Sequence, residues 1–114
     1  MSKIVITYKA FGDAPESGRV VSSVSFEITR EIADYCGISK DIAADNHHNF
    51  CELVFHDTNT YSGRLWFFLE DKLELQAPNR THTALSVGDE IAIDDKTYRC
   101  ENVGWSQVEK AVSR

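Results

Sequence analysis

The most regular alternation of apolar and polar residues in this chain runs from residue 19 to residue 28. Its apolar side carries Val20, Val24, Phe26 and Ile28, together with Ser22. Its polar side carries Ser23, Ser25 and Glu27, together with Val21. Successive side chains of a β-strand point to opposite faces of the sheet, so this pattern predicts a half-buried strand. The chain is therefore expected to build an antiparallel sheet around this segment.

Residues 3–10 are the expected partner of that strand. They also alternate with a period of two and are rich in β-branched side chains. The connecting residues 12–18 are a cluster of turn formers in which Pro15 stands between two glycines. We expect the two segments to pair as an N-terminal β-hairpin with a long exposed loop.

A short helix is expected over residues 30–36. The Thr29 hydroxyl can accept a hydrogen bond from a free amide of the first turn, and Gly37 supplies the left-handed conformation that ends a helix. The apolar side of this helix holds Ile32, Ala33 and Cys36. A second turn or helix, capped by Ser39, is expected to reach Ala44.

The middle of the chain is expected to form strands. Residues 50–56 alternate between two faces, and residues 64–69 are apolar on both sides of an extended chain, which is typical of a central strand. On this interpretation the chain turns after residue 69 and enters a further strand over residues 73–76. An alternative is a helix beginning at Ser62, because helical spacing also aligns Leu65, Phe68, Leu69 and Leu73. Gly63 and the aromatic density favour the strand.

A second hairpin is expected near the C-terminus. If Asp94 and Asp95 are its two turn residues, Ile93 faces Lys96 across the pair of strands. The apolar face of this hairpin then consists of Ile91, Ile93, Tyr98 and Cys100. A last short strand or turn is expected over residues 103–105, before a frayed tail over residues 108–114.

These elements predict a mainly β protein with one or two short helices. The expected architecture is a small antiparallel barrel or sandwich of about seven short strands, in a single domain spanning residues 1–114. No run of apolar residues approaches the roughly 20 that a membrane span needs, and the N-terminus lacks the apolar run of a signal peptide. We therefore expect a cytoplasmic protein that does not interact with membranes.

The charge balance predicts what kind of partner suits the chain. It carries 12 Lys and Arg residues against 18 Asp and Glu residues, a formal net charge of −6. Sequence-independent binding to DNA or RNA needs basic residues against phosphates, so a nucleic-acid partner is not expected. A protein partner with a basic surface fits better.

No catalytic or metal-binding motif stands out. Cys36, Cys51 and Cys100 have neither disulfide nor zinc-ribbon spacing, and we expect reduced thiols. Residues 45–57 contain metal-ligand types, but on a strand Cys51 and His56 would point to opposite faces. We therefore expect no metal, no cofactor and no nucleophile.

The leading functional hypothesis is a small, acidic, non-enzymatic protein-binding module, such as an inhibitor, antagonist or immunity-type protein that covers a basic surface. The residues expected to contact the partner are Asp13, Glu16, Asp57, Tyr61 and Trp66. An exposed Trp or Phe of residues 65–69, rimmed by Arg64, Glu70 and Glu74, would suit a binding hot spot or dimerisation.

Two alternatives stay open. The first is a β-barrel that binds a small molecule or nucleotide, with or without enzymatic activity. The residues expected at its mouth are His47, His48, His56, Tyr61 and Arg64. The second is a structural component of an assembly.

Overall fold

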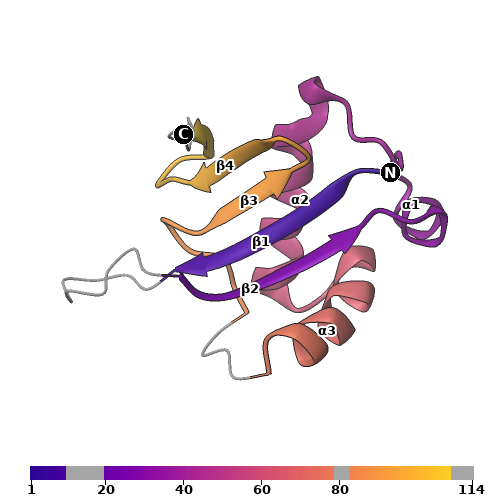
Figure 1. Ribbon diagram of the computed structural model, residues 1–114, viewed down its shortest axis with the longest axis horizontal. Helices are drawn as coiled ribbons and strands as arrows, with labels where there is room; N and C mark the ends of the chain where they lie inside the picture. The colour runs from indigo at the N-terminus through magenta and orange to yellow at the C-terminus, as the bar shows by residue number, and fades with distance from the viewer. Residues whose placement is uncertain (10–19, 79–82, 109–114) are drawn as a thin grey trace, which may run out of the picture.

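A single five-stranded antiparallel sheet organises the protein, and its two longer helices pack on one face of that sheet. The computed structural model describes residues 1–9, 20–78 and 83–108. The strands are β1 (Lys3–Lys9), β2 (Val20–Glu27), β3 (Glu90–Ile93), β4 (Lys96–Cys100) and β5 (Trp105–Val108), in the order β2-β1-β3-β4-β5. The helices are α1 (Arg30–Cys36), the 3₁₀ turn η1 (Ala44–Asn46), α2 (His47–Thr60) and α3 (Arg64–Gln76). Figure 1 shows the strands in front and α2 behind them.

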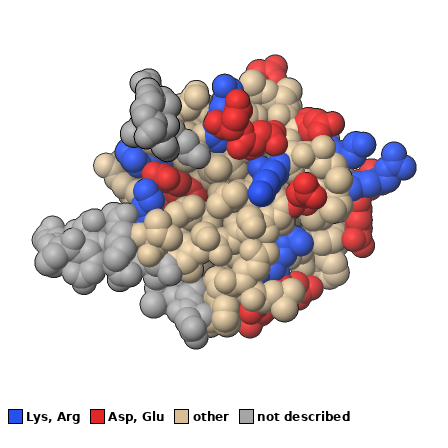
Figure 2. Space-filling model, viewed as in Figure 1, with Lys and Arg blue, Asp and Glu red and all other residues tan. Residues whose placement is uncertain are grey.

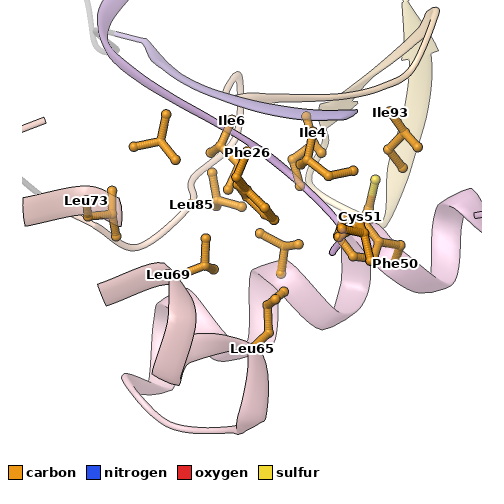
Figure 3. Packing of buried hydrophobic residues seen from close by; sticks show 14 of the residues in the cluster. Ile4, Ile6, Phe26, Phe50, Cys51, Leu65, Leu69, Leu73, Leu85 and Ile93 are labelled. Atoms are coloured by element: carbon orange, nitrogen blue, oxygen red, sulfur yellow. The ribbon is translucent and has the colours of Figure 1, made fainter. Parts of the chain in front are cut away.

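The core fills the space between the sheet and the helices. Side chains of the strands point toward side chains of α2 and α3 across this space, as Figure 3 shows. The sheet contributes Ile4, Ile6, Tyr8, Val24, Phe26, Ile91, Ile93 and Tyr98. The helices contribute Phe50, Cys51, Val54, Leu65, Leu69 and Leu73. Burial of this apolar surface is the main term that stabilises the two layers against each other.

Both hairpins are confirmed. β1 and β2 pair antiparallel with Ile4 opposite Phe26, and β3 and β4 pair with Ile93 opposite Lys96. Asp94 takes a left-handed φ of 56° in the turn between β3 and β4. The predicted loop over residues 12–18 lies outside the described residues, as does the predicted tail beyond Val108.

The short helix over residues 30–36 is also confirmed as α1. The Thr29 hydroxyl accepts a hydrogen bond from the Ile32 amide at 3.2 Å, and Gly37 ends the helix with a φ of 69°. The last strand, β5, begins two residues later than the start of the predicted segment and pairs with β4.

The expected barrel or sandwich of about seven strands is wrong. Among the described residues the sheet has five strands and is open, and the three segments predicted as strands over residues 50–56, 64–69 and 73–76 belong to α2 and α3. The buried residues of α3 are Leu65, Leu69 and Leu73, one every four positions, which is the period of a helix face. The helical alternative is thus correct. Gly63, which favoured the strand in the sequence, does not destabilise this helix, because it precedes the first helical residue.

The sheet face away from the helices is lined by short and charged side chains. Glu90 pairs there with Lys9 on β1 at 2.9 Å and with Arg99 on β4 at 3.3 Å. In Figure 2, seen from the same side as Figure 1, acidic and basic residues are interspersed around uncharged surface. This face therefore presents no extended field of one sign.

A glutamine side chain occupies the outer edge of β2. The Ser25 amide donates to Gln76 Oε1, and Gln76 Nε2 donates to the Ser25 carbonyl, both at 2.8 Å. Gln76 is the last residue of α3, so its amide takes the place that a sixth strand would occupy beside Ser25. Because unpaired strand edges invite pairing with other chains, this contact protects the edge.

Replacing Gln76 with Ala is expected to free the Ser25 edge. The loss of two exposed hydrogen bonds should lower the free energy of unfolding by about 1 kcal/mol and increase self-association. Denaturant unfolding and analytical ultracentrifugation over a concentration series measure both effects. Gln107→Ala on the opposite edge strand is the matched control. A Gln76→Ala protein with unchanged association would show that this contact does not protect the edge.

Candidate functional site

A cluster of aromatic side chains joins α1 to α3 at the surface. The ring of Tyr35 in α1 lies 5.6 Å from the rings of both Phe67 and Phe68 in α3, and those two rings are 5.3 Å apart. Arg64 is the fourth member of the cluster. Its guanidinium lies 5.6 Å from the centre of the Tyr35 ring and donates a hydrogen bond to the Tyr35 carbonyl at 3.1 Å. We call these four residues the aromatic patch.

The geometry of α3 explains why the aromatic patch is exposed. Leu65, Leu69 and Leu73 turn one side of the helix toward the core, so the opposite side faces water. Phe67 lies on that opposite side and keeps 64% of its surface exposed. Leu75, eight positions further along, is 82% exposed. Two large apolar side chains on the outer side of one helix are not needed by the core.

Acidic residues surround the patch. At helical spacing, Glu70, Asp71 and Glu74 lie three, four and seven positions after Phe67, on the outward side of α3. Asp34 precedes Tyr35 in α1 and is exposed. The basic residue Lys72 instead lies against the Phe26 ring, with its ammonium 5.7 Å from the ring centre. The surface around the patch is thus apolar at its centre and predominantly acidic at its rim.

The sequence hypothesis located part of this surface. The expected rim residues Arg64, Glu70 and Glu74 do accompany an exposed phenylalanine, although on a helix and not on a strand. Tyr35 was missed as a site residue. The sequence contained the information needed to find it. Tyr35 falls outside the apolar stripe of the helix over residues 30–36, so its side chain has to face outward.

Three of the five residues expected to contact a partner are described. Tyr61 ends α2 and is 59% exposed, and its ring lies 5.5 Å from the ring of the half-buried Trp66. The structure therefore brings these two together, beside the start of α3. Asp13 and Glu16 lie outside the described residues.

Asp57 is buried, and its carboxylate organises the start of α3 from within. Oδ2 accepts hydrogen bonds from the amides of Leu65 at 3.1 Å and Trp66 at 3.2 Å, and Oδ1 contacts His56 Nδ1 at 2.9 Å. A carboxylate at the N-terminus of a helix accepts hydrogen bonds from amides that have no partner within the helix, and its negative charge complements the positive end of the helix dipole. Gly63 is required beside it, because a Cβ atom there would lie 2.4 Å from Asp57 Oδ1. Asp57 therefore supports the fold, and its side chain is buried and not exposed at the surface as the sequence suggested.

The five residues expected at the mouth of a ligand pocket are spread along α2 and α3. His47 is buried, with Nδ1 2.8 Å from the Tyr98 hydroxyl and Nε2 3.2 Å from the Ile42 carbonyl. His48 lies against the same Tyr98 ring. His56 is nine positions beyond His47, about 14 Å along a helix, and Tyr61 is further still. Arg64 belongs to the aromatic patch, so these side chains do not line a common mouth.

A shallow groove between the loop after α1 and the start of α2 contains none of those five residues. Its volume is about 280 Å³. It is lined by Gly37, Ile38, Ser39, Ile42, Asn46, Asn49, Phe50 and Leu53. None of these lining residues has an ionisable side chain, so they supply no general acid or base.

The cysteines are free thiols, of which Cys51 and Cys100 are buried and Cys36 is half-buried. Burial, with a smaller effect of Glu52, raises the pKa of Cys51 to about 12. Burial also raises the pKa of Cys36 and of Cys100. A thiol with a raised pKa carries little thiolate at neutral pH and is a poor nucleophile.

Two features are absent among the residues that the structure describes. Among them, no three His, Cys, Asp or Glu side chains are grouped so that they could hold a metal ion. Within the same residues, no helix combines the length and apolar character needed to cross a membrane. Comparisons with protein families, with curated proteins and with solved structures find no match to this chain.

Removal of the Asp57 carboxylate is expected to destabilise the protein. In Asp57→Ala the amides of Leu65 and Trp66 lose their acceptor, which should lower the free energy of unfolding by about 2 to 3 kcal/mol. Gly63→Ala should cost a similar amount, because of its φ of 103° and the contact with Asp57. Urea unfolding checks both. Asp34→Ala, an exposed aspartate, should change stability by less than about 0.5 kcal/mol. Equal stability of Asp57→Ala and Asp34→Ala would contradict the role given to Asp57.

Proposed function

We propose that this protein is a non-enzymatic protein-binding module that uses the aromatic patch to cover a basic surface of a partner, as an inhibitor, antagonist or immunity-type protein would. The observation that carries the proposal is Phe67, which stands largely exposed between Tyr35 and Phe68 although the core does not need it. Aromatic residues and arginine are enriched at the centres of protein interfaces.

The architecture of the patch supports a protein ligand. The rings of Tyr35, Phe67 and Phe68 are held against one another on two helices that pack together, so little freedom remains to be lost on binding. Arg64 is fixed by its contacts with Tyr35. A rigid aromatic centre with a charged rim is the usual composition of an interface hot spot and its surroundings.

The charge distribution supports a basic partner. The carboxylates of Glu70, Asp71 and Glu74 follow Phe67 on the outward side of α3, and the whole chain carries a net charge of −6. Such a field accelerates encounter with a positive surface, and it weakens as salt increases. Tyr61 and Trp66 flank the start of α3 and would extend the contact.

The experiment begins with capture of the partner by the tagged 114-residue chain from its native cell. Capture is done at low salt and at about 0.5 M salt, where the Debye length is only about 4 Å. The partner is identified by mass spectrometry, purified, and titrated by calorimetry with the parent protein and with variants. Phe67→Ala is expected to weaken the complex by about 30-fold, which corresponds to a hot spot of about 2 kcal/mol.

Val87→Ala is the matched control, because Val87 is an exposed apolar residue outside α1 and α3. It should bind with the affinity of the parent protein. Circular dichroism verifies that both variants fold. A partner that binds Phe67→Ala and the parent equally would remove the aromatic patch from the interface, and a complex insensitive to salt would exclude the basic surface.

A further inference from the structure

A small pocket opens between α2 and the hairpin formed by β4 and β5. Its volume is about 160 Å³. It is lined by Glu52, Phe55, Cys100, Glu101, Asn102, Gly104 and Trp105. Pockets for cofactors and drug-sized ligands occupy about 300 to 1,000 Å³, so this one has room for the end of a single side chain.

Two aromatic rings form walls of the pocket. Phe55 projects from α2 and Trp105 begins β5, and their rings lie 6.3 Å apart at an angle of 86°. Both side chains are half-buried, so part of each ring still meets water. The exposed face of a tryptophan attracts cations within about 6 Å of its centre, because the ring carries a quadrupole that is negative on its face.

Two carboxylates complete the pocket. Glu52 precedes Phe55 by three positions in α2 and therefore projects from the same side of the helix. Glu101 follows β4, and the Ser106 hydroxyl donates to its Oε2 at 2.6 Å, which fixes its orientation. In the described part of the chain, no Lys, Arg or His forms an ion pair with either carboxylate.

The negative charge of the two carboxylates affects the pKa of Cys100. Cys100 is buried and lines the same pocket, and its pKa is raised first by burial and then by Asp89, Glu52 and Glu101. Glu52 and Glu101 thus act on the same small volume from opposite sides of the α2–hairpin junction. A cation placed there would be attracted by both carboxylates and by the tryptophan face.

We infer that this pocket receives the guanidinium group of an arginine side chain presented by a protein partner. Charge complementarity selects a cation, and the small volume selects a single side chain. Arginine fits better than lysine because its planar head stacks on an aromatic ring while it donates hydrogen bonds to carboxylates in its plane. The tip of the hairpin adds Val103, which is 92% exposed and offers an apolar contact to the chain that carries the arginine.

This site shares no residue with the aromatic patch, and its test does not use the unidentified partner. The probe is N-acetyl-arginine methylamide, titrated into the ¹⁵N-labelled full chain. The chain has two tryptophans, so its indole N–H signals report separately on the pocket through Trp105 and on the α3 region through Trp66. We expect a saturable shift of the Trp105 signal with a Kd in the millimolar range and no shift of the Trp66 signal.

The controls separate guanidinium recognition from general effects. The citrulline counterpart has the same shape without the charge and should produce no saturable shift, and the lysine counterpart should bind at least about 3-fold more weakly. Glu52→Gln and Glu101→Gln should each weaken binding about 5-fold, and the double variant should abolish it. Glu27→Gln, an exposed carboxylate on β2, should leave binding unchanged.

The inference would be overturned by a Trp105 signal that does not saturate, by equal binding of the citrulline or lysine compound, or by full binding to the double variant. Because the indole of Trp105 also reports the fold of the hairpin, the spectra without probe show whether each variant retains the pocket.

Discussion

The carboxylate of Asp57 determines where α3 begins, and the position of α3 determines much else. Two amides at the start of that helix donate to Oδ2, so the end of α2 and the start of α3 are joined through one buried side chain. Gly63 makes the approach possible by having no Cβ. With this start fixed, Leu65, Leu69 and Leu73 face the sheet, and Phe67 has to face away from it. The same interaction thereby places both the core stripe and the aromatic patch.

The N-terminal and C-terminal parts of the chain could be predicted from the sequence, and the middle of the chain could not. Period-two alternation identified β1, β2 and the hairpin of β3 and β4, down to Ile93 opposite Lys96. In those segments local pattern and tertiary environment agree. In residues 64–76 they conflict, because a run of large apolar and aromatic residues suits a buried strand as well as a helix. The helix forms because packing against the sheet buries every fourth residue. The start of the helix could not be recognised locally, because the side chain that caps it belongs to Asp57, eight residues before Leu65.

The candidate site could likewise be predicted only in part from the sequence. For residues 65–69 the sequence suggested an exposed aromatic side chain only if a strand there were covered on one side, whereas the structure exposes Phe67 on a helix. Asp57 was placed with the surface contacts because a loop was expected there, whereas a helix turns its side chain inward. The pocket of Phe55, Trp105, Glu52 and Glu101 was invisible in the sequence, because it joins residues about fifty positions apart. Only the packing of the C-terminal hairpin on α2 brings them together.

The contact between Gln76 and Ser25 has a consequence for how copies of this chain can assemble. A fibre built by adding strand to strand needs two available edges on every molecule, one to accept the previous copy and one to receive the next. Here the middle of the β2 edge is already occupied by a side chain of the same molecule, so an incoming strand would first have to displace it. As long as this contact holds, strand pairing has mainly the β5 edge available, and one available edge per molecule gives at most a closed pair. Protection of one edge of the sheet thus favours a finite assembly over a fibre.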